Sequence, residues 1–120
     1  MKNILLILAF ALALAACEQN NELPLLLPSG AEPSAKIHND RGIGHYSKGK
    51  YFDALLEFTQ ASVADSTTGE IHFNIALMLH RRDEPNRAAE HFKLAKKYAD
   101  GNKAILESRL LNQYLNQEQK

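Results

Sequence analysis

The stretch that decides the fold is residues 42–61, GIGHYSKGKYFDALLEFTQA, because its pattern returns 34 residues later. The second copy is residues 76–95, ALMLHRRDEPNRAAEHFKLA. The shared small and aromatic residues are Gly42, Ala54, Phe58 and Ala61, followed by Ala76, Ala88, Phe92 and Ala95. A fixed period of this length indicates helical hairpins stacked in a row. Such stacks provide extended concave binding surfaces.

Each copy has the pattern of two antiparallel helices. In the first copy, apolar residues recur at the spacing of one helix face; they are Tyr51, Ala54, Leu55, Phe58 and Ala61. Gly49 suits the end of the preceding helix, because glycine accepts the left-handed conformation found there. We therefore expect the first hairpin over about residues 36–64, within a domain of residues 35–120.

The second hairpin is expected over about residues 69–98. Thr67 and Glu70 have the spacing of a capping box at its start, and Pro85 suits the first position of its second helix. The helix from residue 70 to 82 is apolar on nearly all sides, which is typical of a helix buried on both sides.

The two ends of the stack are more polar than its middle. Residues 36–48 carry the polar composition of an exposed end, and about residues 102–116 alternate apolar and polar residues as a capping helix does. Repeat arrays usually need about three units for stability, so a homodimer is also suspected.

A resemblance to a known family follows from these residues. The segment Gly42-x-x-x-Tyr46-x-x-Gly49-x-Tyr51-x-x-Ala54-x-x-x-Phe58-x-x-Ala61 resembles a tetratricopeptide repeat (TPR). The second copy is similar to it at the same offsets, but has Asp83 and Pro85 in place of the central glycine and tyrosine. The resemblance implies an all-α fold: two TPR-like hairpins plus a C-terminal capping helix, forming a short α-solenoid.

In the family that this chain resembles, the first helix of each hairpin lines a concave groove. The resemblance and the helical spacing assign six residues to that groove as a partner-binding stripe: Asn39, Ile43, Tyr46, Phe73, Leu77 and His80. The expected partner is an extended segment or a helix of another envelope protein. The alternative is that the linker or the C-terminal helix fills the groove.

Some relatives use this groove to clamp the terminal carboxylate of a partner. Asn74 and Lys36 resemble two members of such a clamp. The remaining positions are occupied by Ile43, Ala104 and Ser108, which carry no suitable charge. The sequence therefore argues against a carboxylate clamp.

The N-terminus has the pattern of a secretory signal peptide. A positive start precedes an apolar run over residues 4–16, which is shorter than the roughly 20 residues that span a bilayer. The run ends in Leu14-Ala15-Ala16-Cys17, which resembles the lipobox of bacterial lipoproteins. The resemblance implies cleavage after residue 16 and lipidation of Cys17. Glu18 in place of aspartate implies sorting to the periplasmic face of the outer membrane. The alternative is an ordinary signal whose cysteine is incidental.

Residues 17–34 are expected to form a flexible tether rich in proline, serine and glycine. An extended chain of that length reaches about 50 Å at roughly 3.1 Å per residue. The stretch Leu25–Leu27 is an apolar exception within the tether. We expect it to pack against the domain or the lipid headgroups; the alternative is a short docking peptide for a partner.

The remaining composition excludes several function classes. The formal net charge is zero, so a nucleic-acid partner is not expected. The five histidines lack metal-ligand spacing, and no phosphate loop or catalytic triad pattern is present. We therefore expect no enzyme, no cofactor and no metal, but a membrane-anchored adaptor or assembly factor. The alternatives are a permanent subunit of an envelope complex and, less favoured, a metal-binding protein.

Overall fold

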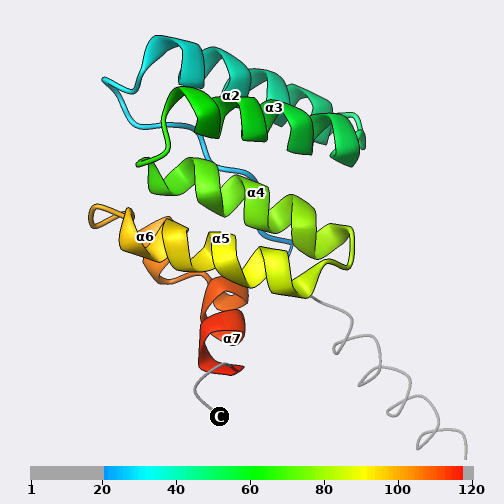
Figure 1. Ribbon diagram of the computed structural model, residues 1–120, viewed down its shortest axis with the longest axis vertical. Coiled ribbons are helices and arrows are strands. Elements are labelled where there is room, and N and C mark those ends of the chain that lie inside the picture. The colour runs from blue at the N-terminus through cyan, green and yellow to red at the C-terminus, as the bar shows by residue number, and fades with distance from the viewer. Residues whose placement is uncertain (1–20, 118–120) are drawn as a thin grey trace, which may run out of the picture.

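The computed structural model describes residues 21–117, which form six α-helices and no strand (Figure 1). The helices are α2 (Pro33–Ser47), α3 (Tyr51–Ala64), α4 (Gly69–Arg81), α5 (Pro85–Lys97), α6 (Lys103–Leu106) and α7 (Arg109–Gln117). The hairpins α2–α3 and α4–α5 stack through α3 and α4, and α7 packs on α5. The predicted all-α fold of stacked hairpins is confirmed. The predicted signal peptide and Cys17 lie outside the described residues.

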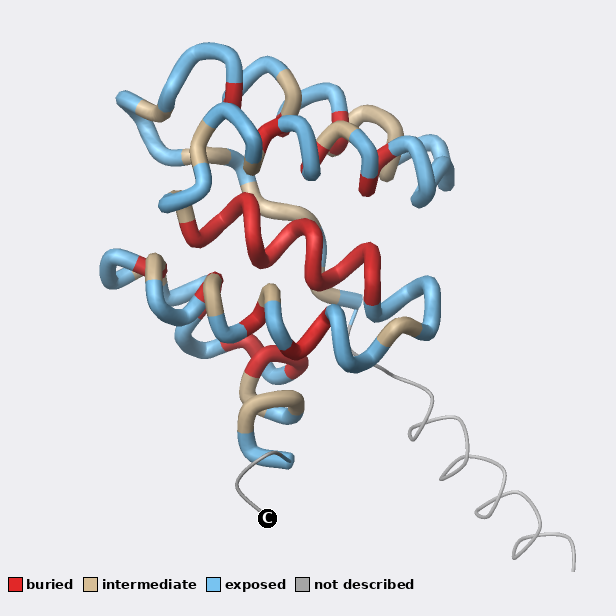
Figure 2. The backbone as a smooth tube through the Cα atoms, viewed as in Figure 1, coloured by how far each residue is buried: buried red, intermediate tan, exposed pale blue. Residues whose placement is uncertain are grey.

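Helix α4 is the centre of the molecule. Every residue from Gly69 to Leu79 is buried, because α3 covers one side of the helix and α5 covers the other (Figure 2). Helix α2, at the end of the stack, buries only Ala35, Asn39 and Gly42. The sequence predicted both the buried middle helix and the polar end helix.

Two glycines allow close contacts between helices. A Cβ atom at Gly42 would lie 2.5 Å from Cε1 of Phe58, whose side chain is fully buried. A Cβ atom at Gly69 would lie 2.5 Å from the carbonyl oxygen of Tyr98. Because buried rings and backbone cannot yield much space, any larger residue at these positions would push the helices apart.

The two hairpin turns have the same shape. Gly49 has φ +74° and donates its N–H to the carbonyl of Tyr46 at 2.9 Å. Asp83, 34 residues later, has φ +59° and donates its N–H to the carbonyl of His80 at 3.1 Å. The period therefore fixes the turn geometry even where an aspartate replaces the glycine. The left-handed conformation is less favourable for that aspartate.

The start of α4 differs from the predicted capping box. Thr68 is the N-cap, and the carboxylate of Asp65 accepts the Thr67 N–H at 2.9 Å and the Thr68 hydroxyl at 2.6 Å. These hydrogen bonds lower the pKa of Asp65. Glu70 instead accepts a 2.8 Å hydrogen bond from the amide of Asn102. The predicted pair of Thr67 and Glu70 is wrong because Asp65 supplies the carboxylate from within the turn.

Helix α2 begins earlier than expected. The carboxylate of Glu32 accepts the N–H of Ala35 at 2.6 Å, and Pro33 occupies the first helical turn, where its missing N–H costs nothing. Together these two residues start α2 three positions before residue 36.

The predicted capping helix is interrupted. It divides into α6 and α7 around Glu107 and Ser108. The hydroxyl of Ser108 accepts the N–H of Leu111 at 3.0 Å, so Ser108 caps the start of α7. Within residues 21–117, none of the helices combines the length and the apolar composition needed to cross a bilayer.

Candidate functional site: the face covered by residues 22–27

The first helices of both hairpins and the C-terminal helix pair share one face, and residues 22–27 lie on it. We call these residues the resident segment and this face the segment face. In Figure 1 the resident segment passes behind α4 toward the start of α2. It has no helix or strand of its own. The described part of the predicted tether is therefore in contact with the domain.

Two asparagines bind one residue of the resident segment through its backbone. Asn74 of α4 accepts the N–H of Leu25 at 2.7 Å and donates to the carbonyl of Leu25 at 2.9 Å. Asn39 of α2 donates to the same carbonyl at 3.0 Å, and Asn74 also donates to the Asn39 Oδ1 at 2.9 Å. Both asparagine side chains are fully buried. Burying amides is costly without hydrogen bonds, so the backbone of Leu25 satisfies groups that the fold has desolvated.

The carboxylate of Glu22 is held at the start of α7. Ser108 donates its hydroxyl to Glu22 Oε2 at 2.7 Å, and Arg109 donates its backbone N–H to Glu22 Oε1 at 3.0 Å. A carboxylate is favoured at a helix N-terminus, where N–H groups lack partners inside the helix. The contact lies at the break between α6 and α7, where the N–H of Arg109 begins a new helix.

The leucines of the resident segment alternate between buried and exposed. Leu25 and Leu27 are half-buried against the core, whereas Leu23 and Leu26 are 63% and 70% exposed. An extended chain points successive side chains to opposite sides, which accounts for the alternation at residues 25–27. The expectation that Leu25–Leu27 packs against the domain holds for its first and third residues.

The six residues of the predicted stripe lie in different environments. Asn39 binds the resident segment, and Ile43 and Tyr46 are half-buried beside the core. Phe73 and Leu77 are buried, at 1% and 3% exposure. The structure therefore does not present these residues as one open surface, and their role in binding a partner stays a prediction.

Phe73 is turned toward the second helix of its own hairpin. Its ring meets the ring of Phe92 edge to face, with centroids 5.9 Å apart. The neighbouring residue on α4, Asn74, contacts the resident segment instead. Asn74 was considered above as a clamp residue but was left out of the six-residue stripe, because the 34-residue period pairs Asn39 with Phe73. Lys36, the other clamp residue considered, forms an exposed ion pair with Asp40 at 2.7 Å.

The repeat continues along one rim of the domain. Residues Tyr46, His80 and Tyr114 are spaced by 34 positions, and the last of them lies on α7. His80 Nδ1 lies 2.8 Å from the hydroxyl of Tyr114, and Arg81 donates to the hydroxyl of Tyr46 at 3.0 Å. Burial, and then the charge of Asp83, raise the pKa of Tyr114. The 34-residue spacing of these three residues therefore extends into α7 at this rim.

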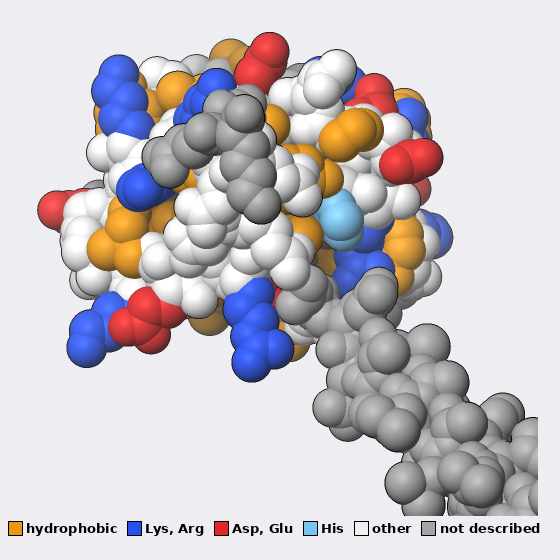
Figure 3. All heavy atoms as spheres, turned by 90° about the horizontal axis from the view of Figure 1, so that it is seen from below, with side chains coloured by type: hydrophobic (Ala, Val, Ile, Leu, Met, Phe, Trp, Pro, Cys, Tyr) orange, Lys and Arg blue, Asp and Glu red, His pale blue; other side chains and the backbone are white. Residues whose placement is uncertain are grey.

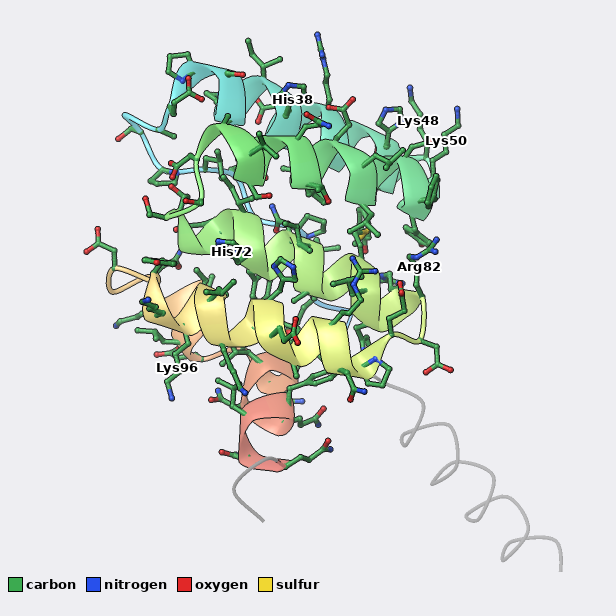
Figure 4. All side chains as sticks on the ribbon, viewed as in Figure 1. His38, Lys48, Lys50, His72, Arg82 and Lys96 are labelled. Carbon is green, nitrogen blue, oxygen red and sulfur yellow. The ribbon has the colours of Figure 1, made fainter. Side chains whose placement is uncertain are left out.

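Histidines connect the two helices of each hairpin. His38 Nδ1 of α2 donates to the Glu57 carboxylate of α3 at 2.7 Å, and His72 Nδ1 of α4 lies 3.2 Å from His91 Nδ1 of α5. Figure 4 labels His38 and His72 on the first helices of the two hairpins. Burial, followed by the nearby His72 and Arg87, lowers the pKa of His91 to about 4. Among residues 21–117, no three His, Cys, Asp or Glu side chains gather as a metal site.

Charges of both signs are interspersed over the end of the molecule seen in Figure 3, with hydrophobic side chains between them. This distribution fits the formal net charge of zero. A protein-family model that matches the chain was not found, and no curated protein matches it. The fold and the contacts of the resident segment therefore carry the functional argument.

Proposed function

We propose that this protein is a membrane-anchored, TPR-like lipoprotein of the bacterial cell envelope that acts as a non-enzymatic adaptor or assembly factor. The observation that supports it most is the contact of Asn39 and Asn74 with the backbone of Leu25. A face that binds its own extended chain in this way has the chemistry to bind the extended chain of another protein.

Anchoring rests on the lipobox resemblance at Cys17. Each buried methylene of an acyl chain contributes about 0.8 kcal/mol, so a single chain binds a membrane weakly and two or three chains bind it firmly. The expected location is the periplasmic face of the outer membrane. Cys17 precedes Glu22 by five positions, so the domain would remain near the lipid surface while the resident segment is bound.

A binding role agrees with the hydrogen bonds that the polar groups of the segment face make. The amides of Asn39 and Asn74 and the hydroxyl of Ser108 are all engaged with the resident segment. Their chemistry is that of hydrogen bonding to peptide and carboxylate groups.

A second candidate, the permanent subunit of one envelope complex, is favoured by the first hairpin. Four large apolar side chains are at least half exposed there: Ile37, Phe52, Leu56 and Val63. Phe52, Leu56 and Val63 follow the spacing of one face of α3. An apolar helix face at the end of a stack suits a lasting neighbour or a second copy of the chain.

Cell fractionation tests the anchor. The unaltered protein is expected in the outer-membrane fraction, and Cys17→Ser in the soluble periplasmic fraction. Gln19→Ser is a matched control that alters the same stretch and leaves the thiol in place. Retention of Cys17→Ser in the membrane would refute lipid anchoring at this residue.

Photo-crosslinking in cells separates the two candidates. A crosslinker at the half-buried Ile43 should capture a partner if the segment face is the binding surface. A crosslinker at Val63, which is 77% exposed on α3, should capture the neighbour of a permanent subunit. Capture from Val63 alone would overturn the adaptor proposal in favour of the second candidate.

A further inference from the structure

We propose that the resident segment is a built-in ligand that a partner displaces. The partner supplies an extended segment of another protein. This segment carries a carboxylate at one position and apolar side chains three and five positions later. In this chain those residues are Glu22, Leu25 and Leu27. The inference rests on the proposed adaptor function and names the chemistry of the partner.

The contacts define what such a partner must carry. Asn39 and Asn74 bind the N–H and carbonyl of one residue, which every amino acid except proline supplies. The side chains of the partner must meet two requirements. Ser108 and Arg109 bind a carboxylate, and the edge of the core packs against two apolar side chains. An extended chain covers about 10 Å over three residues, which fixes the spacing between the two anchor points.

The helices do not depend on the resident segment for their core. Every fully buried core residue lies between Ala35 and Leu111, whereas Leu25 and Leu27 are only partly buried at its edge. The resident segment makes no helix or ladder hydrogen bonds. Segments with few buried contacts open at a lower free energy than the rest of a domain. The resident segment can therefore leave while the hairpins stay folded.

Replacing the resident segment with another segment is more favourable than leaving the segment face empty. While the resident segment is in place, the side chains of Asn39 and Asn74 have no accessible surface. When the resident segment leaves, these amides lose their hydrogen bonds to the backbone of Leu25, which costs free energy. A competing segment supplies the same backbone groups and so avoids this cost. It must overcome the effective concentration of the tethered segment, which is in the millimolar range for a short flexible link.

Displacement changes the length of the tether. With the resident segment bound, five residue steps separate Cys17 from Glu22, a reach of about 16 Å at roughly 3.1 Å per residue. With the resident segment released, the chain is free up to Pro33, and the reach grows to about 50 Å at the same rise. Binding of a partner is thereby coupled to movement of the domain away from the lipid surface.

A peptide-binding experiment tests the displacement. The full chain is purified in detergent micelles and titrated with a fluorescein-labelled peptide of residues 20–30, NNELPLLLPSG, while fluorescence anisotropy is recorded. The double variant E22A/L25A weakens the internal competitor, so the peptide should bind it at least about tenfold more tightly than the unaltered chain. Leu26→Ala is the matched control, because Leu26 is 70% exposed, and it should bind as the unaltered chain does.

Hydrogen–deuterium exchange gives a second readout on the unaltered chain. Saturating peptide should increase exchange at residues 22–27 of the chain and leave α4 protected. A peptide in which Glu22 is changed to lysine and Leu25 to aspartate should produce neither effect. Because this readout uses no variant of the protein, it tests the proposal even if E22A/L25A folds poorly.

Three results would overturn the proposal. The first is no peptide binding to a folded double variant, judged by its circular dichroism. The second is binding that leaves residues 22–27 of the chain protected, which places the peptide elsewhere. The third is that the double variant dimerises and no longer binds the peptide. The segment face would then be occupied by a second copy of the chain. None depends on lipidation, so failure of the membrane anchor and failure of displacement are told apart.

Discussion

The Nδ1 atoms of His72 and His91 lie 3.2 Å apart and connect α4 to α5. The corresponding positions in the first hairpin hold His38 and Glu57, 34 residues earlier in each case. His72 also donates its Nε2–H to the carbonyl of Ser66 at 2.8 Å. The Nδ1 of a neutral His72 must therefore accept the Nδ1–H of His91. The same position in the repeat thus holds a histidine–carboxylate bond in one hairpin and a histidine pair in the other.

His91→Glu should give the second hairpin the bond found in the first. Because Nε2 of His72 already donates to Ser66, a carboxylate at position 91 would favour a doubly protonated His72 that donates from both nitrogens. We expect a gain of about 1 kcal/mol in the free energy of unfolding, because a hydrogen bond from an imidazole N–H to a carboxylate is stronger than one between two imidazoles. Urea unfolding measures the gain. Glu57→His, the reverse exchange, should destabilise the protein, and equal stability of all three proteins would contradict the assignment.

The histidine pair should make the protein sensitive to mild acid. The pKa of His91 is about 4 in the folded protein against an ordinary value of 6.5, so the unfolded chain binds more protons between these values. The free energy of unfolding should therefore be highest above pH 6.5 and decrease as the pH falls from 6.5 to 4. Unfolding midpoints measured across this range test the slope. His91→Gln removes the titrating group and should flatten it, and an unchanged slope in His91→Gln would assign the sensitivity to other groups.

The turn between α4 and α5 should tolerate, and benefit from, a glycine. Asp83 has φ +59°, a conformation that costs residues with a Cβ atom about 1–2 kcal/mol. Asp83→Gly removes this cost but adds freedom to the unfolded chain, so we expect a net gain of up to about 1 kcal/mol. The variant should also lower the pKa of Tyr114, since the charge of Asp83 contributes to raising it.

Thermal unfolding and a spectroscopic titration of the tyrosines measure these two effects. Gly49→Ala is the matched change at the equivalent turn and should destabilise the protein, because it introduces a Cβ atom at φ +74°. A loss of stability in Asp83→Gly would show that the aspartate side chain contributes more than its backbone conformation costs.

Two glycines of α2 should respond to alanine in opposite directions. A Cβ atom at Gly42 would lie 2.5 Å from the buried ring of Phe58, whereas a Cβ atom at Gly44 would meet nothing within 4 Å. Gly42→Ala should cost about 1–3 kcal/mol through overpacking, and Gly44→Ala should gain about 0.5–1 kcal/mol through helix propensity. Urea unfolding of both variants supplies the comparison. Equal effects would contradict the close contact between α2 and α3.

Sequence patterns located the helices because the information is local and repeated. The recurrence of Gly42, Ala54 and Phe58 as Ala76, Ala88 and Phe92 identifies the residues at helix contacts, since small residues allow close approach and aromatic rings fill the space between helices. The positions of Gly49 and Pro85 then predicted the turns. These features depend on a few neighbouring residues and needed no knowledge of distant contacts.

The segment face required the tertiary structure. Leu25 and Asn74 are 49 positions apart, and no periodicity links them. Glu22 and Ser108 are 86 positions apart, and no local pattern links them. The orientation of Phe73 was equally hidden, because a helix that is apolar on all sides gives no preferred face.

The sequence by itself determined an all-α stack of two hairpins with a closing C-terminal segment, because helix periodicity and repeat spacing are properties of the chain read in order. Only the tertiary structure decided that residues 22–27 cover the first helices and that Asn39 and Asn74 bind them. The physical reason is that buried amides accept whichever backbone groups the folded chain brings within hydrogen-bonding distance, and that distance is set by the packing of the whole domain.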